Sequence, residues 1–130
     1  MSGYSTDIEQ ATQDNTCFRQ VLFTGPQSQL VVMALKPYED IGMEIHPDND
    51  QFIRVESGDG LAIIDGQEFQ LKDGSAVVIP AGAEHNIINT STSDAMKLYT
   101  IYSPAHHPDG TIHATKADAL KAEEEEHKHS

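Results

Sequence analysis

The sequence has little positive charge and almost no cysteine. Its 130 residues include 8 Lys and Arg against 21 Asp and Glu, which gives a formal net charge of −13. A chain this acidic is repelled by nucleic acid and by anionic membranes, so we expect neither as a partner. Cys17 is the single cysteine, which excludes an internal disulfide. No apolar run approaches the roughly 20 residues that span a bilayer.

The start of the chain also lacks the cationic and apolar regions of a signal peptide. Together with the lone cysteine, this favours the reducing cytoplasm as its location. A length of 130 residues suits one domain around a single core.

Long helical patterns are missing from the middle of the chain, which instead contains short apolar or β-branched segments between Gly, Pro, Asn, Asp and Ser. The pair Asp65-Gly66 joins two of these segments and suits a two-residue type I′ hairpin turn. This spacing is typical of an antiparallel sandwich or barrel. The expected strands are 18–23, 30–35, 41–46, 51–55, 61–64, 67–71, 76–79, 85–88 and 97–102.

The two ends differ from this β region. Residues 1–16 are polar and predict a flexible arm or an edge strand, whereas 17–114 hold the barrel and a following flap. Residues 115–130 predict a short helix and an acidic tail, because Thr115 and Asp118 resemble a capping box that opens a helix through Leu120.

Polar side chains interrupt two of the expected strands. Glu44 and His46 are two residues apart, so in an extended chain they share one face. Gln51 shares its face with Ile53 and Val55, so it points inward if that face is the core. A buried polar group needs a partner, and a metal ion is one such partner.

The spacing of a second segment leads to a family resemblance. Gly74, Pro80, Gly82, His85 and Asn89 are separated by five, one, two and three residues, which matches the second motif of the cupins. Glu44, His46, Gln51 and Gly58 resemble the first cupin motif, although Glu44 replaces its usual first His and Gln51 replaces its usual Glu. The chain from roughly Leu30 to Tyr102 therefore resembles a small single-domain cupin.

This resemblance implies an all-β fold, a jelly-roll barrel or double-stranded β-helix, with a divalent metal in its mouth and frequent dimerisation. Carried over position by position, the metal ligands are Glu44, His46, Gln51 and His85. Two imidazoles and one carboxylate suit Fe, and also Zn, Mn or Ni. The alternative is an empty site, in which these side chains hydrogen-bond one another and water.

The sequence leaves the reaction open. One hypothesis is an isomerase or lyase that uses the metal as a Lewis acid on a small, oxygen-rich metabolite, loosely resembling phosphomannose isomerase. The others are a non-haem Fe(II) dioxygenase and a non-catalytic module that binds a small ligand. With only Arg19 and Arg54 available to grip phosphate, a phosphorylated substrate is disfavoured.

Candidates for proton transfer are His106, His107, Tyr99 and Tyr102. The histidine-rich segment 106–113 could close over the site, but we expect a surface connection. A homodimer is also expected, because Ile41, Met43 and Ile45 form an apolar face opposite the ligands that needs a cover.

Overall fold

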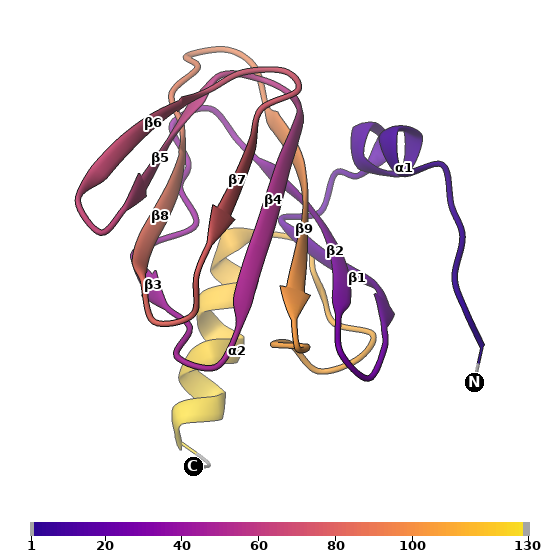
Figure 1. The fold of residues 1–130 in the computed structure, drawn as a ribbon. Helices are drawn as coiled ribbons and strands as arrows, with labels where there is room; N and C mark the ends of the chain where they lie inside the picture. Colours follow the sequence, from indigo (N-terminus) through magenta and orange to yellow (C-terminus); the bar gives the residue numbers. More distant parts are fainter. Residues whose placement is uncertain (1, 129–130) are drawn as a thin grey trace.

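The chain folds into two antiparallel β-sheets that face each other. The computed structural model describes residues 2–128. One sheet has six strands in the order β10-β1-β2-β9-β4-β7, and the other has four in the order β3-β8-β5-β6. Figure 1 shows the two sheets as the walls of a barrel, with helix α1 beside the larger sheet and helix α2 behind the barrel. The elements are α1 (Ile8–Asp14), β1 (Arg19–Thr24), β2 (Gln29–Leu35), β3 (Glu44–Ile45), β4 (Asp50–Ser57), β5 (Gly60–Ile64), β6 (Gln67–Leu71), β7 (Ala76–Ile79), β8 (Glu84–Asn89), β9 (Met96–Ser103), β10 (Ile112–His113) and α2 (Lys116–Lys128).

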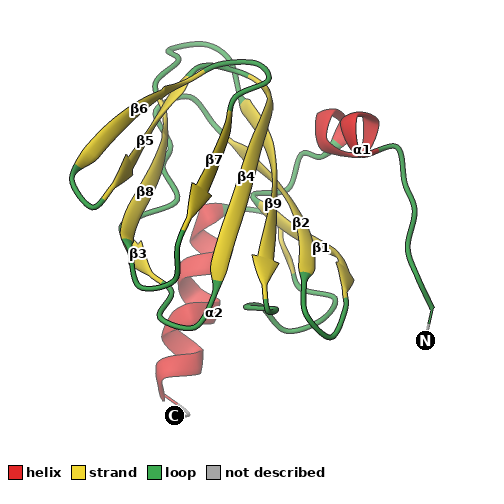
Figure 2. Cartoon of the chain, in the orientation of Figure 1, coloured by secondary structure: helices red, strands yellow, loops and turns green. Residues whose placement is uncertain are grey.

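This architecture is the predicted jelly-roll barrel with a C-terminal helix, which confirms the fold class (Figure 2). Eight of the nine expected strands agree with observed ones within about two residues at either end. The expected strand 41–46 is reduced to β3, and β10 was not expected. Pro47 follows soon after β3 and has no N–H to continue a ladder.

Alternating burial along the strands builds the core between the sheets. In β4, Gln51, Ile53 and Val55 are buried and the residues between them are partly exposed, as the alternation of the sequence predicts. In β9, Leu98 and Tyr102 are buried in the same way. Each fully buried aliphatic side chain contributes about 1.5–3 kcal/mol, so this double layer is the main source of stability.

The hairpin between β5 and β6 has the predicted turn. Asp65 and Gly66 have φ values of 47° and 80°, and a type I′ turn requires positive φ at both central residues. Its twist matches that of the flanking strands, so β5 and β6 pair from Gly60 with Leu71 to Ile64 with Gln67.

The N-terminal segment differs from the expected arm or edge strand, because it contains α1. The side chain of Asp7 caps this helix by accepting a hydrogen bond of 3.1 Å from the N–H of Gln10. Thr12 is fully buried, and α1 contacts β2, β4 and β9. A helix of seven residues is too short for its apolar period to stand out in a sequence.

The C-terminal helix begins at the predicted capping box. The Thr115 hydroxyl accepts a hydrogen bond from the N–H of Asp118, and the Asp118 carboxylate accepts one from the N–H of Thr115. The helix continues to Lys128, beyond the expected end at Leu120. The last two residues of the expected acidic tail, 129–130, lie outside the described residues. Neither described helix is long and apolar enough to cross a membrane.

The first testable consequence concerns Gly60, at the start of β5. A Cβ atom at this position would lie 1.9 Å from Cε of Met96 and 2.5 Å from the backbone oxygen of Ile88. We expect Gly60→Ala to lower the free energy of unfolding by about 1–3 kcal/mol, because strand β8 would have to shift. Urea denaturation measures this change.

The control is Gly3→Ala, where an added Cβ would meet nothing within 4 Å. Equal stability of the two variants would contradict the close packing of β5 against β8.

Candidate metal centre

Two neighbouring strands bring the predicted ligands together. Glu44 of β3 pairs with His85 of β8 in the antiparallel register, and His46 follows β3 directly. The backbone N–H of Gly82 donates a hydrogen bond of 2.9 Å to the carbonyl of His46, which joins the two sequence motifs. One ligand atom from each of Glu44, His46 and His85 lies within 4.8 Å of the others. Ligands about 2.1 Å from one ion lie at most about 4.2 Å apart, so a small adjustment would let all three reach one ion.

The cluster is largely shielded from water. His46 is 6% exposed and His85 is 3% exposed, while the Glu44 side chain is 21% exposed. Nδ1 of His85 lies 3.0 Å from the carbonyl oxygen of Ala83, so it donates a hydrogen bond to that oxygen in the neutral ring. This orients the ring and leaves Nε2 available as a ligand.

Glu44 and His46 are arranged as two ligands of one ion. Nε2 of His46 lies 2.9 Å from Oε2 of Glu44, a distance short enough for an ion pair. Nevertheless, Nε2 is buried and has no partner with hydrogen-bond geometry. The two atoms therefore lie side by side, and a cation next to both would satisfy them.

The electrostatic surroundings keep Glu44 ionised. Burial alone would raise the pKa of Glu44, but the neighbouring His46, with smaller contributions from Arg19 and His85, lowers it below its ordinary value. A carboxylate ligand must be deprotonated, and the lowered pKa of Glu44 meets that requirement.

Gln51, the fourth predicted ligand, lies on β4 and has an unsatisfied side-chain oxygen. Its side chain is 3% exposed, and Nε2 donates a hydrogen bond of 3.0 Å to the Thr100 hydroxyl. Oε1 is buried without a hydrogen-bond partner. The strand register places Gln51 opposite Tyr102, and the Tyr102 ring lies 5.7 Å from that of His46.

The histidine-rich segment after β9 is largely exposed, as expected for a surface connection, but its first two histidines pack against residues of the site. The ring centroid of His106 lies 4.1 Å from that of His46 and 5.3 Å from that of Tyr102. His107 packs edge-on against Tyr102 at 5.2 Å. The segment therefore brings two further imidazoles next to the ligand cluster.

Gln29 holds this segment in place. Its side chain is fully buried and accepts hydrogen bonds from the backbone N–H groups of His106 and His107, at 3.2 and 3.0 Å. Its Nε2 donates one of 2.8 Å to the carbonyl of His107. Asn49 adds a hydrogen bond of 2.6 Å to the carbonyl of Pro104.

Burial also sets the protonation of the surrounding groups. It lowers the pKa of His106 to about 4, and the charge of His46 is the second cause of this shift. It lowers the pKa of His107 to about 2, and there the second cause is the charge of Arg19. Burial raises the pKa of Tyr102. At pH 7 both imidazoles are therefore neutral and the phenol is protonated.

Comparison with known proteins agrees with this geometry. Residues 31–102, more than half of the chain, match the family model described as the cupin domain. This chain belongs to the cupin family. The match includes both ligand segments, the whole four-stranded sheet and most of strands β2, β4, β7 and β9 of the larger sheet.

Three relatives of this cupin are similar over most of its length. The chain is 47% identical to the uncharacterized protein YrkC of Bacillus subtilis over 93% of this chain and 68% of that protein. It is 50% identical to an uncharacterized protein of Acanthamoeba polyphaga mimivirus, over 84% of this chain and 70% of that protein. A crystal structure from Bacillus halodurans has 42% identity and a TM-score of 0.90, covering 92% of this chain and 95% of the other.

The structure separates the two tyrosine candidates of this cupin. Tyr102 is buried beside the cluster, whereas Tyr99 alternates to the outer face of the larger sheet, where its ring lies 6.3 Å from that of Phe52. Tyr99 therefore does not offer its hydroxyl to the site. The two tyrosines are three positions apart along one strand, so they point to opposite faces.

Sequence reasoning missed Gln29 as a site residue and treated Arg19 only as a phosphate binder. Each of them shares a strand face with a buried apolar residue two positions further on. Gln29 shares its face with Val31, and Arg19 shares its face with Val21. The alternation that placed Gln51 inside the barrel could have placed these two inside as well.

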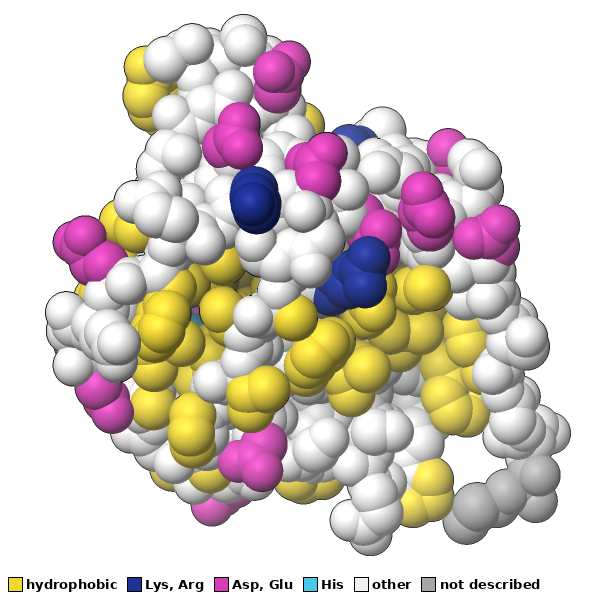
Figure 3. All heavy atoms as spheres, turned by 45° about the horizontal axis from the view of Figure 1, so that its top comes forward, with side chains coloured by type: hydrophobic (Ala, Val, Ile, Leu, Met, Phe, Trp, Pro, Cys, Tyr) yellow, Lys and Arg dark blue, Asp and Glu magenta, His cyan; other side chains and the backbone are white. Residues whose placement is uncertain are grey.

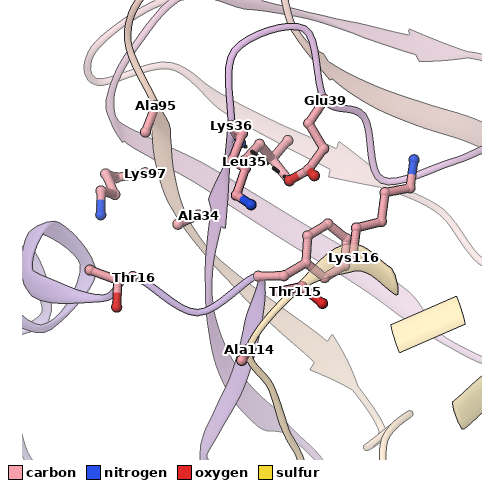
Figure 4. Close-up of a pocket in the computed structure, with 11 residues that line it drawn as sticks. Thr16, Ala34, Leu35, Lys36, Glu39, Ala95, Lys97, Ala114, Thr115 and Lys116 are labelled. Atoms are coloured by element: carbon pink, nitrogen blue, oxygen red, sulfur yellow. Dashed lines mark hydrogen bonds between the residues drawn. The ribbon is translucent and has the colours of Figure 1, made fainter. Parts of the chain in front are cut away.

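A separate cavity of about 190 Å³ lies away from the cluster. It is lined by residues that follow α1 and by parts of β2, β9 and the start of α2 (Figure 4). Lys36, Lys97 and Lys116 line it together with alanines, but none of the predicted site residues does. Lys116 is paired with Asp40 and Lys97 donates to the carbonyl of Asn15, so two of the three ammonium groups already have partners.

The role of Gln29 in the cupin site can be tested with Gln29→Leu. This change removes the acceptor of two partly buried N–H groups, those of His106 and His107, which we expect to lower the free energy of unfolding by about 1–3 kcal/mol. Hydrogen exchange followed by mass spectrometry should become faster in residues 104–108. Gln27→Leu, at an exposed position, is the matched control. Unchanged exchange in Gln29→Leu would show that other contacts hold the segment.

Proposed function

We propose that this cupin binds one divalent metal ion, Zn, Mn, Ni or Fe, through Glu44, His46, Gln51 and His85. The observation that carries the proposal is the convergence of one carboxylate and two imidazoles within 4.8 Å. Oε1 of Gln51, which is buried without a hydrogen-bond partner, and Nε2 of His46, whose neighbour is Oε2 of Glu44 at 2.9 Å, support it, because both are atoms that a cation could bind. Imidazole nitrogens with carboxylate and amide oxygens suit these metals.

We further propose that the cupin is a metal-dependent enzyme of isomerase or lyase type, acting on a small oxygen-rich metabolite. A bound ion with one anionic ligand would keep a net positive charge and polarise a hydroxyl or carbonyl oxygen. His106 is our candidate for accepting a proton, since its ring is neutral at pH 7 and lies 4.1 Å from that of His46. Tyr102, with its raised pKa, keeps its proton and can donate a hydrogen bond.

Two alternatives each have an observation in their favour. The set of two histidines and one carboxylate favours a non-haem Fe(II) dioxygenase. The low pKa of His106, far from the pH-7 range of an efficient base, favours a non-catalytic cupin that holds a small ligand. The identity of the bound metal separates the first alternative from the isomerase or lyase.

The metal test uses untagged protein purified without added metal, in a His127→Asn, His129→Asn background that removes stray binding by the C-terminal histidines. We expect about one metal ion per chain, and at least about hundredfold weaker binding in Glu44→Ala, His46→Ala and His85→Ala. Elemental analysis and calorimetric titration measure this. Glu84→Ala is the control, because Glu84 neighbours His85 but is exposed.

Iron together with oxygen uptake would favour the dioxygenase, and zinc without oxygen uptake the isomerase or lyase. If the wild-type protein neither contains metal nor takes it up on titration, the site is empty and the metal proposal fails.

We also propose that the cupin forms a homodimer through the outer face near β3. Met43 and Ile45 are 53% and 54% exposed in the single chain, although their face is apolar. Figure 3, which views the molecule from another side, shows apolar side chains gathered in broad areas and acidic groups scattered among them. A second copy of the chain would cover the exposed Met43 and Ile45 side chains through a symmetric contact.

Sedimentation velocity tests the dimer. We expect the wild-type protein to sediment as a dimer at micromolar concentration and Ile45→Asp to shift it toward monomer, because burying a new carboxylate in the interface is costly. Leu120→Asp is the control, since Leu120 on α2 is equally exposed at 53%. A monomeric wild-type protein would exclude the proposal.

A further inference from the structure

The position of Glu44 depends on a short strand. β3 has two residues, and its register places Glu44 opposite His85. Just before it, the N–H of Ile41 donates a hydrogen bond of 2.9 Å to the carbonyl of Ile87 in β8. Gly42 then turns the chain with a φ of 104°, a conformation that glycine adopts readily. Because two paired residues hold a strand weakly, contacts at Gly42 help to decide where Glu44 lies.

The side chain of Asn86 holds Gly42 against β8. Asn86 follows His85 in β8, so it points to the opposite face of the sheet, where it is 8% exposed. Its Oδ1 accepts a hydrogen bond of 2.9 Å from the N–H of Gly42, and its Nδ2 donates one of 2.9 Å to Oδ2 of Asp40. A half-turn of the amide would exchange these two ends, but an ionised carboxylate can only accept. Asp40 therefore keeps Oδ1 of Asn86 directed at Gly42.

Lys116 in turn holds Asp40. Oδ1 of Asp40 accepts a hydrogen bond from Nζ of Lys116, the first residue of α2. The Lys116 and Asp40 side chains are 25% and 36% exposed, so water screens this ion pair less than one on the open surface. The hydrogen bond from Lys116 is the largest cause, and the one from Asn86 the next, of a pKa of Asp40 below its ordinary value. The ionised carboxylate thus has one oxygen bonded to Lys116 and the other to Asn86.

The start of α2 is fixed to the larger sheet. β10, which leads into α2, pairs with β1, and the N–H of Phe18 donates a hydrogen bond of 3.1 Å to the carbonyl of Ala114. The capping box of Thr115 and Asp118 then sets the first turn of the helix, and with it the place of Lys116. These contacts lead from the larger sheet, through the start of α2, to the segment that precedes β3 in the smaller sheet.

We infer that Lys116, Asp40 and Asn86 form a bridge from α2 to the segment before β3. The bridge positions Glu44 opposite His85, and its effect on metal affinity rests on the proposed function. The three are positioning residues, since they act on the ligand through the backbone before β3. An ion pair that only anchored α2 would leave metal binding unchanged, and this difference makes the inference testable.

The test is calorimetric titration of the metal-free, untagged protein with zinc, in the same background as the metal test above. We expect Asp40→Ala and Lys116→Met each to bind zinc about tenfold more weakly, because losing a residue that orients a ligand typically costs about 10–100-fold in metal affinity. Lys116→Arg keeps the charge and should bind zinc like the wild type. Asp59→Ala and Lys121→Met are the matched controls, since both side chains are exposed and Lys121 also lies on α2.

Hydrogen exchange of the metal-free protein gives a second reading that needs no metal. In Asp40→Ala and Lys116→Met, residues 41–45 should exchange faster, while β9 exchanges and the protein melts as in the wild type. A partly exposed ion pair adds little to global stability, so a local effect is expected. If both variants melt at a lower temperature and β9 also exchanges faster, the pair is a general structural contact and the inference is overturned.

The remaining outcomes separate this inference from the proposed function. If the wild-type protein binds zinc and both variants bind it equally well, the metal proposal stands and the bridge has no positioning role. If the wild-type protein takes up no zinc, the metal proposal fails, and hydrogen exchange alone decides about the bridge. Faster exchange confined to residues 41–45 then supports it, and unchanged exchange in both variants overturns it.

Discussion

The antiparallel register between β3 and β8 is the constraint on which the candidate site depends. It places Glu44 directly opposite His85, and a slip by one residue would turn one of them to the outside. β3 has only two residues, so its own ladder is weak. The register is reinforced before the strand, where the N–H of Gly42 donates to Oδ1 of Asn86, and after it, where the N–H of Gly82 donates to the carbonyl of His46. Residues of both cupin motifs therefore fix the ligands through backbone geometry.

The barrel interior combines an apolar part with a polar part that is only partly satisfied. Leu98, Ile53 and similar side chains supply the stability, whereas Arg19 and Gln51 keep buried atoms without partners. Such groups cost free energy unless a ligand completes them. By contrast, Gln29 has both ends of its amide bonded, which makes it a structural support for the segment over the site.

Much of the fold and the ligand set could be predicted from local patterns. Alternation placed Gln51 inside the barrel, the Asp65-Gly66 pair defined a hairpin, and the spacing around His85 pointed to the family. The helix α1 and the two-residue strand β10 were missed, since both are too short to produce a period. The segment after β9 is largely exposed, as expected, but its ring contacts with the site were not predicted, because the hydrogen bonds from Gln29 and Asn49 that position it join residues more than fifty positions apart.

The sequence by itself determined the all-β class, the faces of the strands and the residue types offered to a metal, because these depend on neighbours a few positions apart. Only the tertiary structure decided which side chains meet. It brought His46 and His106 into contact and sent Tyr99 to the outside, although all three are plausible site residues in the sequence. The physical reason is that burial, charge and hydrogen-bond satisfaction in a barrel depend on pairing between strands, and that pairing joins segments far apart in the chain.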